Sequence, residues 1–558
     1  MPHIEYMTLK DLLKQSTQKF KDNLAFQIKK DLPAGRHGEK YVKYTYGDAG
    51  KYATGLIAAL KGLGIQKGDK VAILGENRPE WAISYLAVTA MGAVAVPLDS
   101  LGTEYDLKGI IAHSESKGIL YSDKFHGIIK EIPNLKFKIL MEKDFEGLKN
   151  RASEDFGYDV SLNDLAAIVY TSGTTGIPKG VMLTHKNIMS NVMTGCALFD
   201  IGPSDMALSV LPIHHMFETV GGFLAWFYSG ARITYAESLK SFKLIQNMVE
   251  TKTTIMIGVP MLYQLFYDGI LREVEEKGPA FKFIFNILIF ISKAVKAVFN
   301  INIGRKLFGQ VHRKLGGAFR FWVSGGAAID PDILKAFDIM GMTIVQGYGL
   351  TESSPVISAN NLSHNKYGSV GRPIPGVCVK IINEEIVANG PNIMQGYFKM
   401  PEETEKVIRD GWLYTGDVGY LDKDGYLYIT GRIKDVIISS SGLNVYPDEV
   451  EFELNKIPYI KESCVIGRKV RAGIKKGSEE VFAVVSPDIE YFEKMGLSID
   501  DNAVFTAIHE AIGKLNEKLP MHKRISGMEV RSTEFPKTST RKIKRFAVRK
   551  EMEKLWQR

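Results

Sequence analysis

The sequence predicts an α/β protein that consists of a large N-terminal domain and a small α+β C-terminal domain. From Tyr46 onward, segments with apolar residues at helical spacing alternate with short apolar runs typical of buried parallel strands. Near Tyr420 this pattern gives way to a β-hairpin with an Asp-Gly turn, followed by a charged segment. The length of 558 residues also exceeds the size at which a single core stops growing, so several units are expected.

In the N-terminal part, a first helix is followed by a predicted strand–helix–strand unit. A helix over 47–61 ends before Gly64, a strand follows over 70–74, and Pro79 opens a second helix. A strand over 93–97 completes the unit, which is the kind that builds parallel sheets. Further strands are expected over 165–169, 206–211, 232–235 and 254–259, with helices over 219–228 and 242–250.

The change of pattern after the hairpin over 420–429 predicts the domain boundary. We expect a large domain over 1–431, a hinge over 432–436 and a small domain over 437–558. The small domain should contain strands over 463–466 and 481–485 and a helix over 503–519.

The composition is that of an ordinary globular protein, with 45% hydrophobic and 24% charged residues, which excludes disordered and fibrous classes. Of the net charge of +8, most lies in residues 537–558, which contain nine basic and two acidic residues. This basic tail suits an acidic partner or is the solvated face of a helix over 546–555. No nucleic-acid-reading motif accompanies it, so no nucleic acid is expected as a partner.

Cysteine usage and the N-terminus predict a cytoplasmic protein. Cys196, Cys378 and Cys464 lie in no disulfide or metal-site spacing, and no secretory signal is evident. The most apolar stretch, 283–291, is too short to cross a bilayer and has lysines at 282, 293 and 296. It predicts either a peripheral contact with the inner face of the membrane or a buried helix pair.

A phosphate-binding loop is predicted over 170–180. Its glycines allow close backbone approach, its hydroxyls and amides can donate to phosphate oxygens, and Lys179 adds a positive charge. The spacing is not that of a Walker A loop, which argues against a P-loop NTPase. The alternative is a polar turn without a ligand.

Two further clusters are suited to a nucleotide. Residues 346–352 place Tyr348 between glycines, where its ring can stack on a base, and end in Glu352, a carboxylate that could hold Mg²⁺. Residues 414–419 place Asp417 in a tight turn, where it could accept hydrogen bonds from ribose hydroxyls. A glycine turn with a core tyrosine is the other interpretation of the first cluster.

Together these clusters resemble the motifs of the adenylate-forming superfamily, and the resemblance covers nearly the whole chain. The segment 75–81 and the long basic, apolar insert between Pro260 and Ser324 are similar to those of long-chain fatty acyl-CoA synthetases. Seven motifs occur in the family's order, over 170–180, 211–218, 323–328, 346–352, 414–419, 431–435 and 536–543.

The resemblance implies ATP-dependent conversion of a long-chain fatty acid to acyl-AMP with release of pyrophosphate, followed by transfer to CoA. An acyl carrier protein as acceptor is the alternative. The partners are then fatty acid, ATP and CoA, with Mg²⁺ as cofactor. The attacking carboxylate is already ionised at pH 7, so no general base is needed, and cations near the phosphates are the main catalysts.

The resemblance also implies roles for individual residues. The ATP-binding residues are Thr171, Ser172, Gly173, Thr174, Thr175, Gly176, Lys179, Gly325, Gly326, Ala327, Gln346, Gly347, Tyr348, Gly349, Thr351, Asp417, Arg432 and Lys542. Thr171 and Glu352 match the Mg²⁺-contacting positions, Lys434 the hinge and Gly442 the CoA channel. Lys542, Arg432 and His215 match catalytic positions.

Several alternatives stay open. Arg541 stands where many relatives have glycine, so Lys544 is the alternative to Lys542 as the adenylation lysine. His214 and His215 could be packing or capping residues, although His215 matches a histidine near the substrate carboxylate. Residues 223–228 fit either a plain core or the wall of an acyl tunnel.

Overall fold

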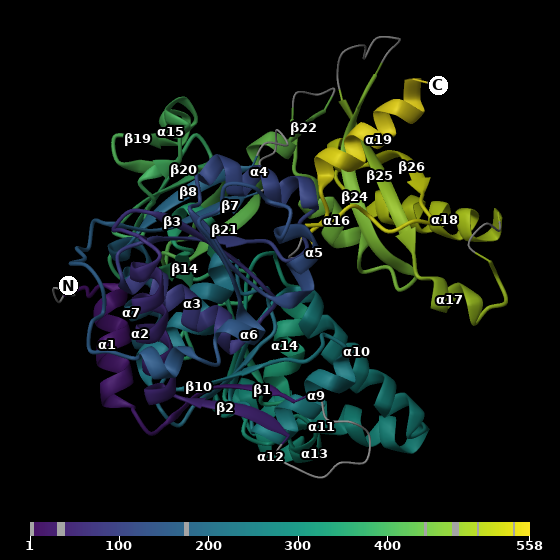
Figure 1. The fold of residues 1–558 in the computed structure, drawn as a ribbon. Helices are drawn as coiled ribbons and strands as arrows, with labels where there is room; N and C mark the ends of the chain where they lie inside the picture. The colour runs from purple at the N-terminus through teal and green to yellow at the C-terminus, as the bar shows by residue number, and fades with distance from the viewer. Residues whose placement is uncertain are drawn as a thin grey trace. The chain divides into compact units, whose positions relative to one another are not determined.

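The computed structural model describes residues 5–30, 40–171, 178–439, 443–470, 479–498, 502–538 and 542–557 (Figure 1). The chain forms two compact units. The first runs to Val379 and includes Ala388–Leu413, and the second comprises Lys380–Val387 and the chain from Tyr414 on. The mixed α/β architecture is confirmed, whereas the hinge over 432–436 stays a prediction.

The first unit contains a nine-stranded sheet in the order β15-β14-β13-β12-β11-β9-β10-β1-β2. The strands from β13 to β1 pair in parallel, and β2, β14 and β15 pair antiparallel at the edges. Its strands are β1 (Leu24–Lys29), β2 (Tyr41–Thr45), β9 (Met206–Ser209), β10 (Arg232–Tyr235), β11 (Ile255–Gly258), β12 (Phe321–Ser324), β13 (Thr343–Gly349), β14 (Val356–Ala359) and β15 (Arg372–Pro373).

A seven-stranded sheet has the order β18-β8-β7-β4-β3-β5-β6. Its centre is parallel, and β8 pairs antiparallel with both β7 and β18. Its strands are β3 (Lys70–Leu74), β4 (Val94–Leu98), β5 (Gly118–Tyr121), β6 (Phe137–Leu140), β7 (Leu165–Thr171), β8 (Lys179–Thr184) and β18 (Gly396–Tyr397).

The predicted strand–helix–strand unit is confirmed as β3, α3 (Pro79–Ala90) and β4. Proline at the first turn starts α3, and its side chains are almost all buried. A capping box between Thr45 and Asp48 starts α2 (Tyr46–Gly62). Other helices of the unit are α1 (Leu9–Lys19), α4 (Glu104–Ser114), α5 (His126–Ile129), α6 (Met141–Asp144), α7 (His185–Phe199), α9 (Ser241–Thr251), α14 (Pro331–Ile339) and α15 (Pro401–Val407).

The segment expected as one helix over 219–228 is a π-helix, η3 (Phe217–Leu224), followed by the short helix α8 (Ala225–Ser229). Phe223, Trp226 and Phe227 are at most 1% exposed. The Phe227 ring stacks on Tyr46 with centroids 4.8 Å apart. These side chains belong to the main core, which favours the core interpretation of 223–228 over a tunnel wall.

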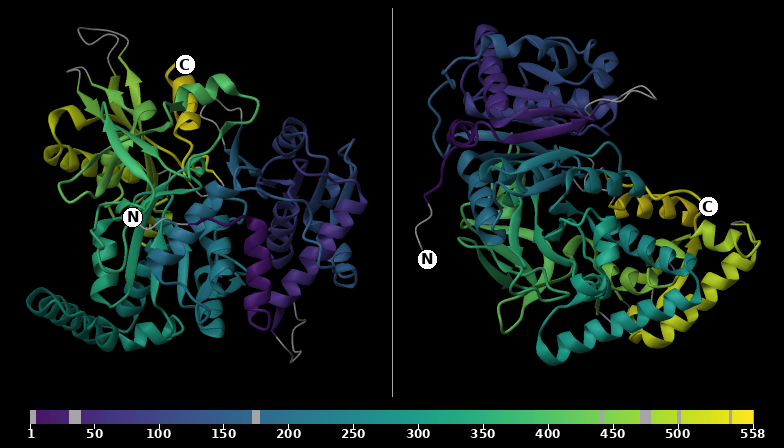
Figure 2. Two further views of the ribbon diagram at one scale, coloured as in Figure 1. Left: turned by 90° about the vertical axis from the view of Figure 1, so that its left-hand side faces the viewer. Right: turned by 90° about the horizontal axis from the view of Figure 1, so that it is seen from below.

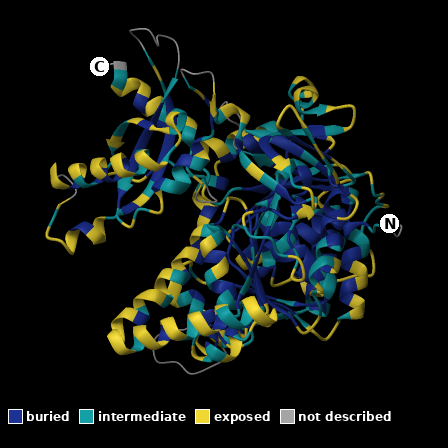
Figure 3. Ribbon diagram, turned by 180° about the vertical axis from the view of Figure 1, so that it is seen from behind, coloured by how far each residue is buried: buried dark blue, intermediate teal, exposed yellow. Residues whose placement is uncertain are grey.

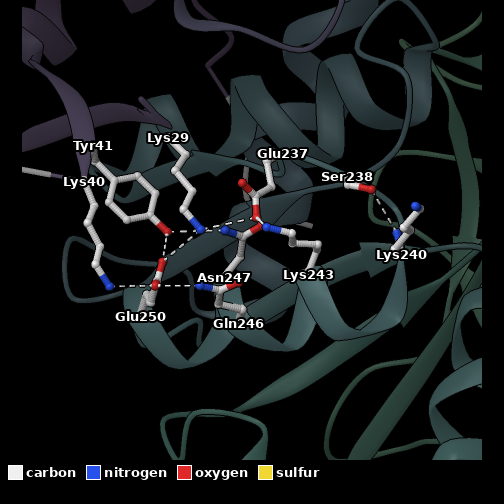
Figure 4. Close-up of polar contacts among 10 residues, drawn as sticks. All are labelled: Lys29, Lys40, Tyr41, Glu237, Ser238, Lys240, Lys243, Gln246, Asn247 and Glu250. Atoms are coloured by element: carbon white, nitrogen blue, oxygen red, sulfur yellow. Dashed lines mark hydrogen bonds and ion pairs between the residues drawn. The ribbon is translucent and has the colours of Figure 1, made fainter. Parts of the chain in front are cut away.

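A charged network fastens α9 to β2, the edge strand, and to its neighbour β1 (Figure 4). Lys29 lies 3.2 Å from Glu237 and 3.6 Å from Glu250, and the Tyr41 hydroxyl donates to Glu250 at 2.8 Å. Burial would raise the pKa of Glu250, but the hydrogen bonds from Tyr41 and Lys40 outweigh it and lower that pKa to about 2. The network therefore ties helix and sheet together through paired charges.

A pair of helices, α10 (Pro260–Glu276) and α11 (Pro279–Phe299), projects from the first unit (Figures 1 and 2). The two short helices α12 (Gly304–Leu307) and α13 (Gly309–Lys314) follow. In the described part of the chain, no helix combines the length and the apolar character that crossing a membrane requires.

The second unit contains a three-stranded sheet of β24 (Ile460–Lys469), β25 (Glu479–Pro487) and β26 (Ile525–Val530). Its helices are α16 (Pro447–Leu454), α17 (Ile489–Glu493), α18 (Asn502–Lys518) and α19 (Arg545–Gln557). The hairpin predicted over 420–429 is confirmed, because β20 (Trp412–Leu421) pairs with β21 (Leu427–Arg432) around Gly425, whose φ is +80°. The remaining strands of the chain are β16 (Cys378–Ile382), β17 (Glu385–Asn389), β19 (Ile408–Arg409), β22 (Ile437–Ile438) and β23 (Asn444–Val445).

Candidate active site

The carboxyl ends of three parallel strands meet at the predicted nucleotide motifs. Gly258 of β11 pairs with Ser324 of β12, which pairs with Gln346 of β13. The Ser324 Oγ and Gln346 Oε1 atoms are buried and have no hydrogen-bond partner in the described part of the chain. Unpaired buried polar atoms are rare, and the carboxyl ends of strands in α/β sheets are typical ligand sites. This edge of the sheet is therefore a candidate ligand site.

Backbone geometry requires two of the glycines here. Gly326, which follows β12 between Gly325 and Ala327, has a φ of +81°, a value that side-chain-bearing residues rarely adopt. A Cβ at Gly349, near the end of the segment Gly347–Gly349, would lie 1.7 Å from the Pro355 carbonyl oxygen. Both motifs thus depend on glycine for their path as well as for access to a ligand.

On the phosphate side, the structure brings together three predicted residues. Thr171 ends β7 directly opposite Lys179, the first residue of β8. Lys179 Nζ lies 4.9 Å from the centre of the Tyr397 ring, and the Tyr397 hydroxyl donates to Glu352 Oε1 at 2.8 Å. Thr351 and Glu352 lie in the short helix η4 (Thr351–Ser353). Ser172, Gly173, Thr174, Thr175 and Gly176 lie outside the described residues.

Lys179 has an acidic partner in Glu403 on α15, to which it donates a hydrogen bond. This bond and a second one from Lys406 lower the pKa of Glu403 to about 2. Burial, reinforced by the charge of Glu352, raises the pKa of Tyr397, so its hydroxyl remains a donor at neutral pH. Tyr397 and Glu403 could not be predicted from the sequence, because the pairing of β18 with β8 and the position of α15 bring them to Lys179 and their own segments carry no local signal.

The carboxylate of Glu352 fits a Mg²⁺ ion bound mainly through ATP. Its Oε1 atom holds the Tyr397 hydroxyl, which fixes the side chain. Mg²⁺ commonly takes one or two carboxylates together with phosphate oxygens and water. Within the described residues, there is no group of three or more His, Cys, Asp or Glu side chains that could hold a metal ion. Glu352 is therefore suited to a metal that arrives with the nucleotide.

The loop after β9, which carries His214 and His215, is held by Asn77 from the loop after β3. The Asn77 amide donates to Ser209 Oγ at 3.0 Å and to the Leu211 carbonyl at 2.6 Å. It also accepts from the backbone N–H of Ile213 at 2.9 Å. Nothing in the sequence of the segment 75–81 predicts this positioning role of Asn77.

The two histidines are neutral at pH 7. His214 Nε2 lies 3.3 Å from Asp99 Oδ1, but burial, together with the nearby His215 ring, lowers the pKa of His214 to about 3. Burial also lowers the pKa of His215, against the effect of Asp99. His215 can therefore orient a carboxylate through a hydrogen bond but supplies no positive charge.

Glu218 is a fully buried carboxyl in η3 that the sequence analysis left without a role. Burial raises the pKa of Glu218 to about 8, against hydrogen bonding from Ser209 and the Leu211 backbone. Those contacts are weak, because neither carboxyl oxygen has a partner with good hydrogen-bond geometry in the described chain. Gly222 makes room for it, since a Cβ there would lie 2.4 Å from Glu218 Cδ. Glu218 is therefore protonated at neutral pH.

In the second unit, the structure brings Asp417, Arg432 and Lys542 together. Asp417 and Arg432 face each other across β20 and β21, with Arg432 Nε 2.8 Å from Asp417 Oδ1. Lys542 is exposed to solvent, and partial loss of hydration together with the positive charge of Arg432 lowers its pKa. Two cations beside one carboxylate form a site suited to an anion.

In the segment 536–543, which we call the tail loop, the described residues Thr538 and Lys542 contact each other. Thr538 N–H donates to the Lys542 carbonyl at 2.8 Å, and Lys542 N–H donates to Thr538 Oγ1 at 3.1 Å. The carbonyl of Lys544 instead accepts hydrogen bonds from the first N–H groups of α19. None of these contacts involves a lysine side chain, and the choice between Lys542 and Lys544 stays a prediction.

Arg545, next along the chain, binds three carboxylates. Its guanidinium lies 2.8 Å from Asp435 and 2.7 Å from both Asp448 and Glu451. Burial raises the pKa of Glu451 against the charge of Arg545, while the charges of these carboxylates raise the pKa of Arg545 despite its burial. Arg545 thus joins the tail loop to α16 and to the segment that contains Lys434. Gly442 lies outside the described residues.

Known proteins and solved structures are similar to this chain over most of its length. Long chain acyl-CoA synthetase 7, peroxisomal, from Arabidopsis thaliana is 30% identical, over 89% of this chain and 75% of that protein. A chloroplastic long-chain-fatty-acid–[acyl-carrier-protein] ligase from the same plant is 26% identical, over 91% of this chain and 80% of that protein. Among solved structures, ATP-bound MatB from Rhodopseudomonas palustris is 25% identical with a TM-score of 0.77, covering 99% of this chain and 100% of that one.

Two protein-family models match the chain. The model described as AMP-binding enzyme matches residues 13–398, and the model described as AMP-binding enzyme C-terminal domain matches residues 434–557. The first match alone covers more than half of the chain and includes the Lys179, Glu352 and Ser324 regions described above. The chain therefore belongs to the family of AMP-binding enzymes.

Proposed function

We propose that this enzyme is an AMP-forming long-chain fatty-acid–CoA ligase. The observation that carries the proposal is the cluster of Thr171, Lys179 and Glu352, joined through Tyr397 at the edge of the seven-stranded sheet. This cluster suits a triphosphate with its metal. We infer the acyl substrate and the acceptor from relatives such as the Arabidopsis long chain acyl-CoA synthetase.

The proposed chemistry has two steps. A carboxylate oxygen of the fatty acid attacks the α-phosphorus of ATP, the bond to the β-phosphate breaks, and pyrophosphate leaves. The sulfur of CoA then attacks the carbonyl carbon of acyl-AMP, the thiol proton is released, and AMP leaves. The ionised fatty acid needs no general base, which agrees with the neutral His214 and His215.

Charge compensation is the main task of the protein groups in the first step. We assign Lys179 to the β- and γ-phosphates, Lys542 to the α-phosphate and substrate carboxylate, and Asp417 with Arg432 to the ribose. Ser324, Gln346 and Tyr348 belong to the adenine side. Mg²⁺ held by Glu352 and Thr171 would neutralise part of the triphosphate charge.

The small domain is proposed to move between the two steps about Lys434. Lys542 must lie against the α-phosphate while acyl-AMP forms, yet the pantetheine arm must later reach the same carbonyl. The tail loop would then serve the first step, and the loop with Gly442 would serve the second. Lys434 lies exposed in the short helix η5 (Ile433–Asp435), between β21 and the rest of the small domain.

CoA is favoured over an acyl carrier protein as the acceptor, although one relative is named for the carrier-protein reaction. Acids of about C12 to C18 are expected, because each buried methylene contributes about 0.8 kcal/mol. A peripheral membrane contact and a cytoplasmic location stay predictions from the sequence.

A panel of acids from acetate to long-chain and aryl acids tests this function. Thioester formation that depends on ATP is measured with CoA and with acyl carrier protein offered separately. Preference for long-chain acids with CoA supports the proposal. A preference for acetate or aryl acids would refute the substrate class, and exclusive use of the carrier protein would replace CoA as acceptor.

A further inference from the structure

The helix α11 has two faces of opposite character. One face is packed: Phe285 is 9% and Ser292 1% exposed, and the Ser292 hydroxyl donates to the Ile339 carbonyl at 2.6 Å. Lys296 on the same side binds Asp338. This inner face fastens α11 to the core beneath the nine-stranded sheet.

The other face of α11, which we call the outer face, is open to solvent, as the exposed residues of Figure 3 show. Phe283 is 68% and Phe290 72% exposed, values unusual for phenylalanine. Most exposed apolar side chains of this helix are spaced three, four or seven residues apart, at 283, 287, 290, 291 and 298. They therefore share one side of the helix. The outer face consists of Phe283, Ile284, Ile287, Phe290, Ile291 and Val298, each at least 39% exposed.

The charged residues of α11 and of the two short helices after it are all basic, and Glu275 at the end of α10 is an acidic neighbour of this face. Residues 277–315, which include α11, α12 and α13, contain eight lysines and arginines and no aspartate or glutamate. Lys282 and Lys293 are eleven positions apart, about three helical turns, and therefore line the same edge of the outer face. Lys282 pairs with Glu275 at 3.1 Å, whereas Lys293 has no acidic partner in the described chain. The apolar surface is thus bordered by positive charge.

We propose that the outer face of α11 docks on the surface of an anionic phospholipid bilayer. A helix with one apolar face and basic edges lies in the plane of the interface, with its apolar side chains among the acyl chains and its lysines at the headgroups. The packed inner face holds the rest of the first unit against this surface. The positive border matches anionic lipid and distinguishes this occupant from a second copy of the same basic surface.

Flotation with vesicles tests the proposal directly. Vesicles of equal parts phosphatidylcholine and phosphatidylglycerol should carry the full-length protein in the absence of ATP and fatty acid, and pure phosphatidylcholine should carry less. The double variant Phe283→Gln/Phe290→Gln should lower the partition coefficient about ten-fold. The matched control Leu101→Gln/Tyr105→Gln changes two side chains that are 65% and 86% exposed elsewhere and should bind like the wild type.

A second pair of changes tests the charge. Lys282→Glu/Lys293→Glu should weaken binding to the anionic vesicles by at least about ten-fold and leave the weak binding to phosphatidylcholine little changed. Lys296 is left intact because its contact with Asp338 belongs to the packed face. Circular dichroism and thermal unfolding would verify that each variant remains folded.

Three results would overturn the proposal. They are absence of wild-type flotation, equal loss in the Leu101/Tyr105 control, and a Phe283/Phe290 variant that turns a dimer into a monomer while its vesicle binding is unchanged. The last result would assign the face to a second copy. Flotation needs no catalysis, so a failed ligase assay with intact vesicle binding would refute the proposed function and leave this surface standing.

Discussion

Lys179 in the first unit and Arg545 in the second unit are held by their acidic partners in different ways. In the first unit Lys179 has one acidic partner, Glu403, whose side chain is 33% exposed. In the second unit Arg545 is 12% exposed and contacts three carboxylates. A single exposed partner is easily exchanged for a phosphate, whereas a buried guanidinium among three acids is not. We infer that Lys179 serves binding, that Arg545 serves architecture, and that Lys542 beside it serves catalysis.

Removal of Lys542 should have the largest effect on activity. Lys542→Ala should lower acyl-AMP formation about 10²- to 10³-fold, because the variant loses a cation at the position where negative charge develops. It should still convert supplied acyl-AMP and CoA to product. Pyrophosphate release and thioester formation would be measured separately, with Lys544→Ala as the control.

The converse variant, Lys434→Pro, restricts the proposed hinge. It should retain much of the first step and lose the second. Equal damage to both steps by Lys542→Ala, or no damage to either by Lys434→Pro, would contradict the movement proposed for the small domain.

Removal of Arg545 should affect stability most. Arg545→Met leaves Asp435, Asp448 and Glu451 without their shared cation, and breaking a buried ion pair costs about 3–5 kcal/mol of unfolding free energy. Urea unfolding of the full chain would measure this loss. Lys550→Met, on an exposed position of α19, should change stability little, and an equal effect of both variants would remove Arg545 from its structural role.

Glu403→Gln should have a smaller effect, and in the opposite direction. Without the competing carboxylate, Lys179 is free for phosphate, so the KM for ATP should fall about two- to five-fold. Steady-state kinetics would show this, with the adjacent Glu402→Gln as control. A rise in KM instead would mean that Glu403 positions Lys179 for the nucleotide.

Much of the fold could be predicted from the sequence because its signals are local. The strands β3 and β10 have the predicted bounds, since short apolar runs with clear ends produced them. The site was only partly predictable. Tyr397 reaches Lys179 across more than 200 residues of chain, and the π-helix around Glu218 depends on tertiary packing. Neither feature has a periodic or spacing signal in its own segment.

Glu218 should give the smallest effect, a change in how stability depends on pH. Its pKa is raised to about 8 in the folded protein, so the unfolded chain loses this proton first as the pH rises. Stability should therefore fall between about pH 5 and pH 8 and change no further through this group above that range. In Glu218→Gln the Tm should change less with pH than in the wild type, by on the order of a few °C over this range.

The measurement is the Tm of both proteins across this pH range. Glu276→Gln, an exposed glutamate on α10, is the matched control. Parallel curves for wild type and Glu218→Gln would show that Glu218 is ionised in the folded protein at neutral pH.

Product analysis tests the central claim most directly. Phosphorus NMR of a reaction with ATP, Mg²⁺, palmitate and CoA distinguishes cleavage at the α-phosphate from cleavage at the γ-phosphate. We predict AMP and pyrophosphate in equal amounts, formed only when the fatty acid is present. ADP and inorganic phosphate as the products would contradict the assignment of this site to acyl-AMP formation.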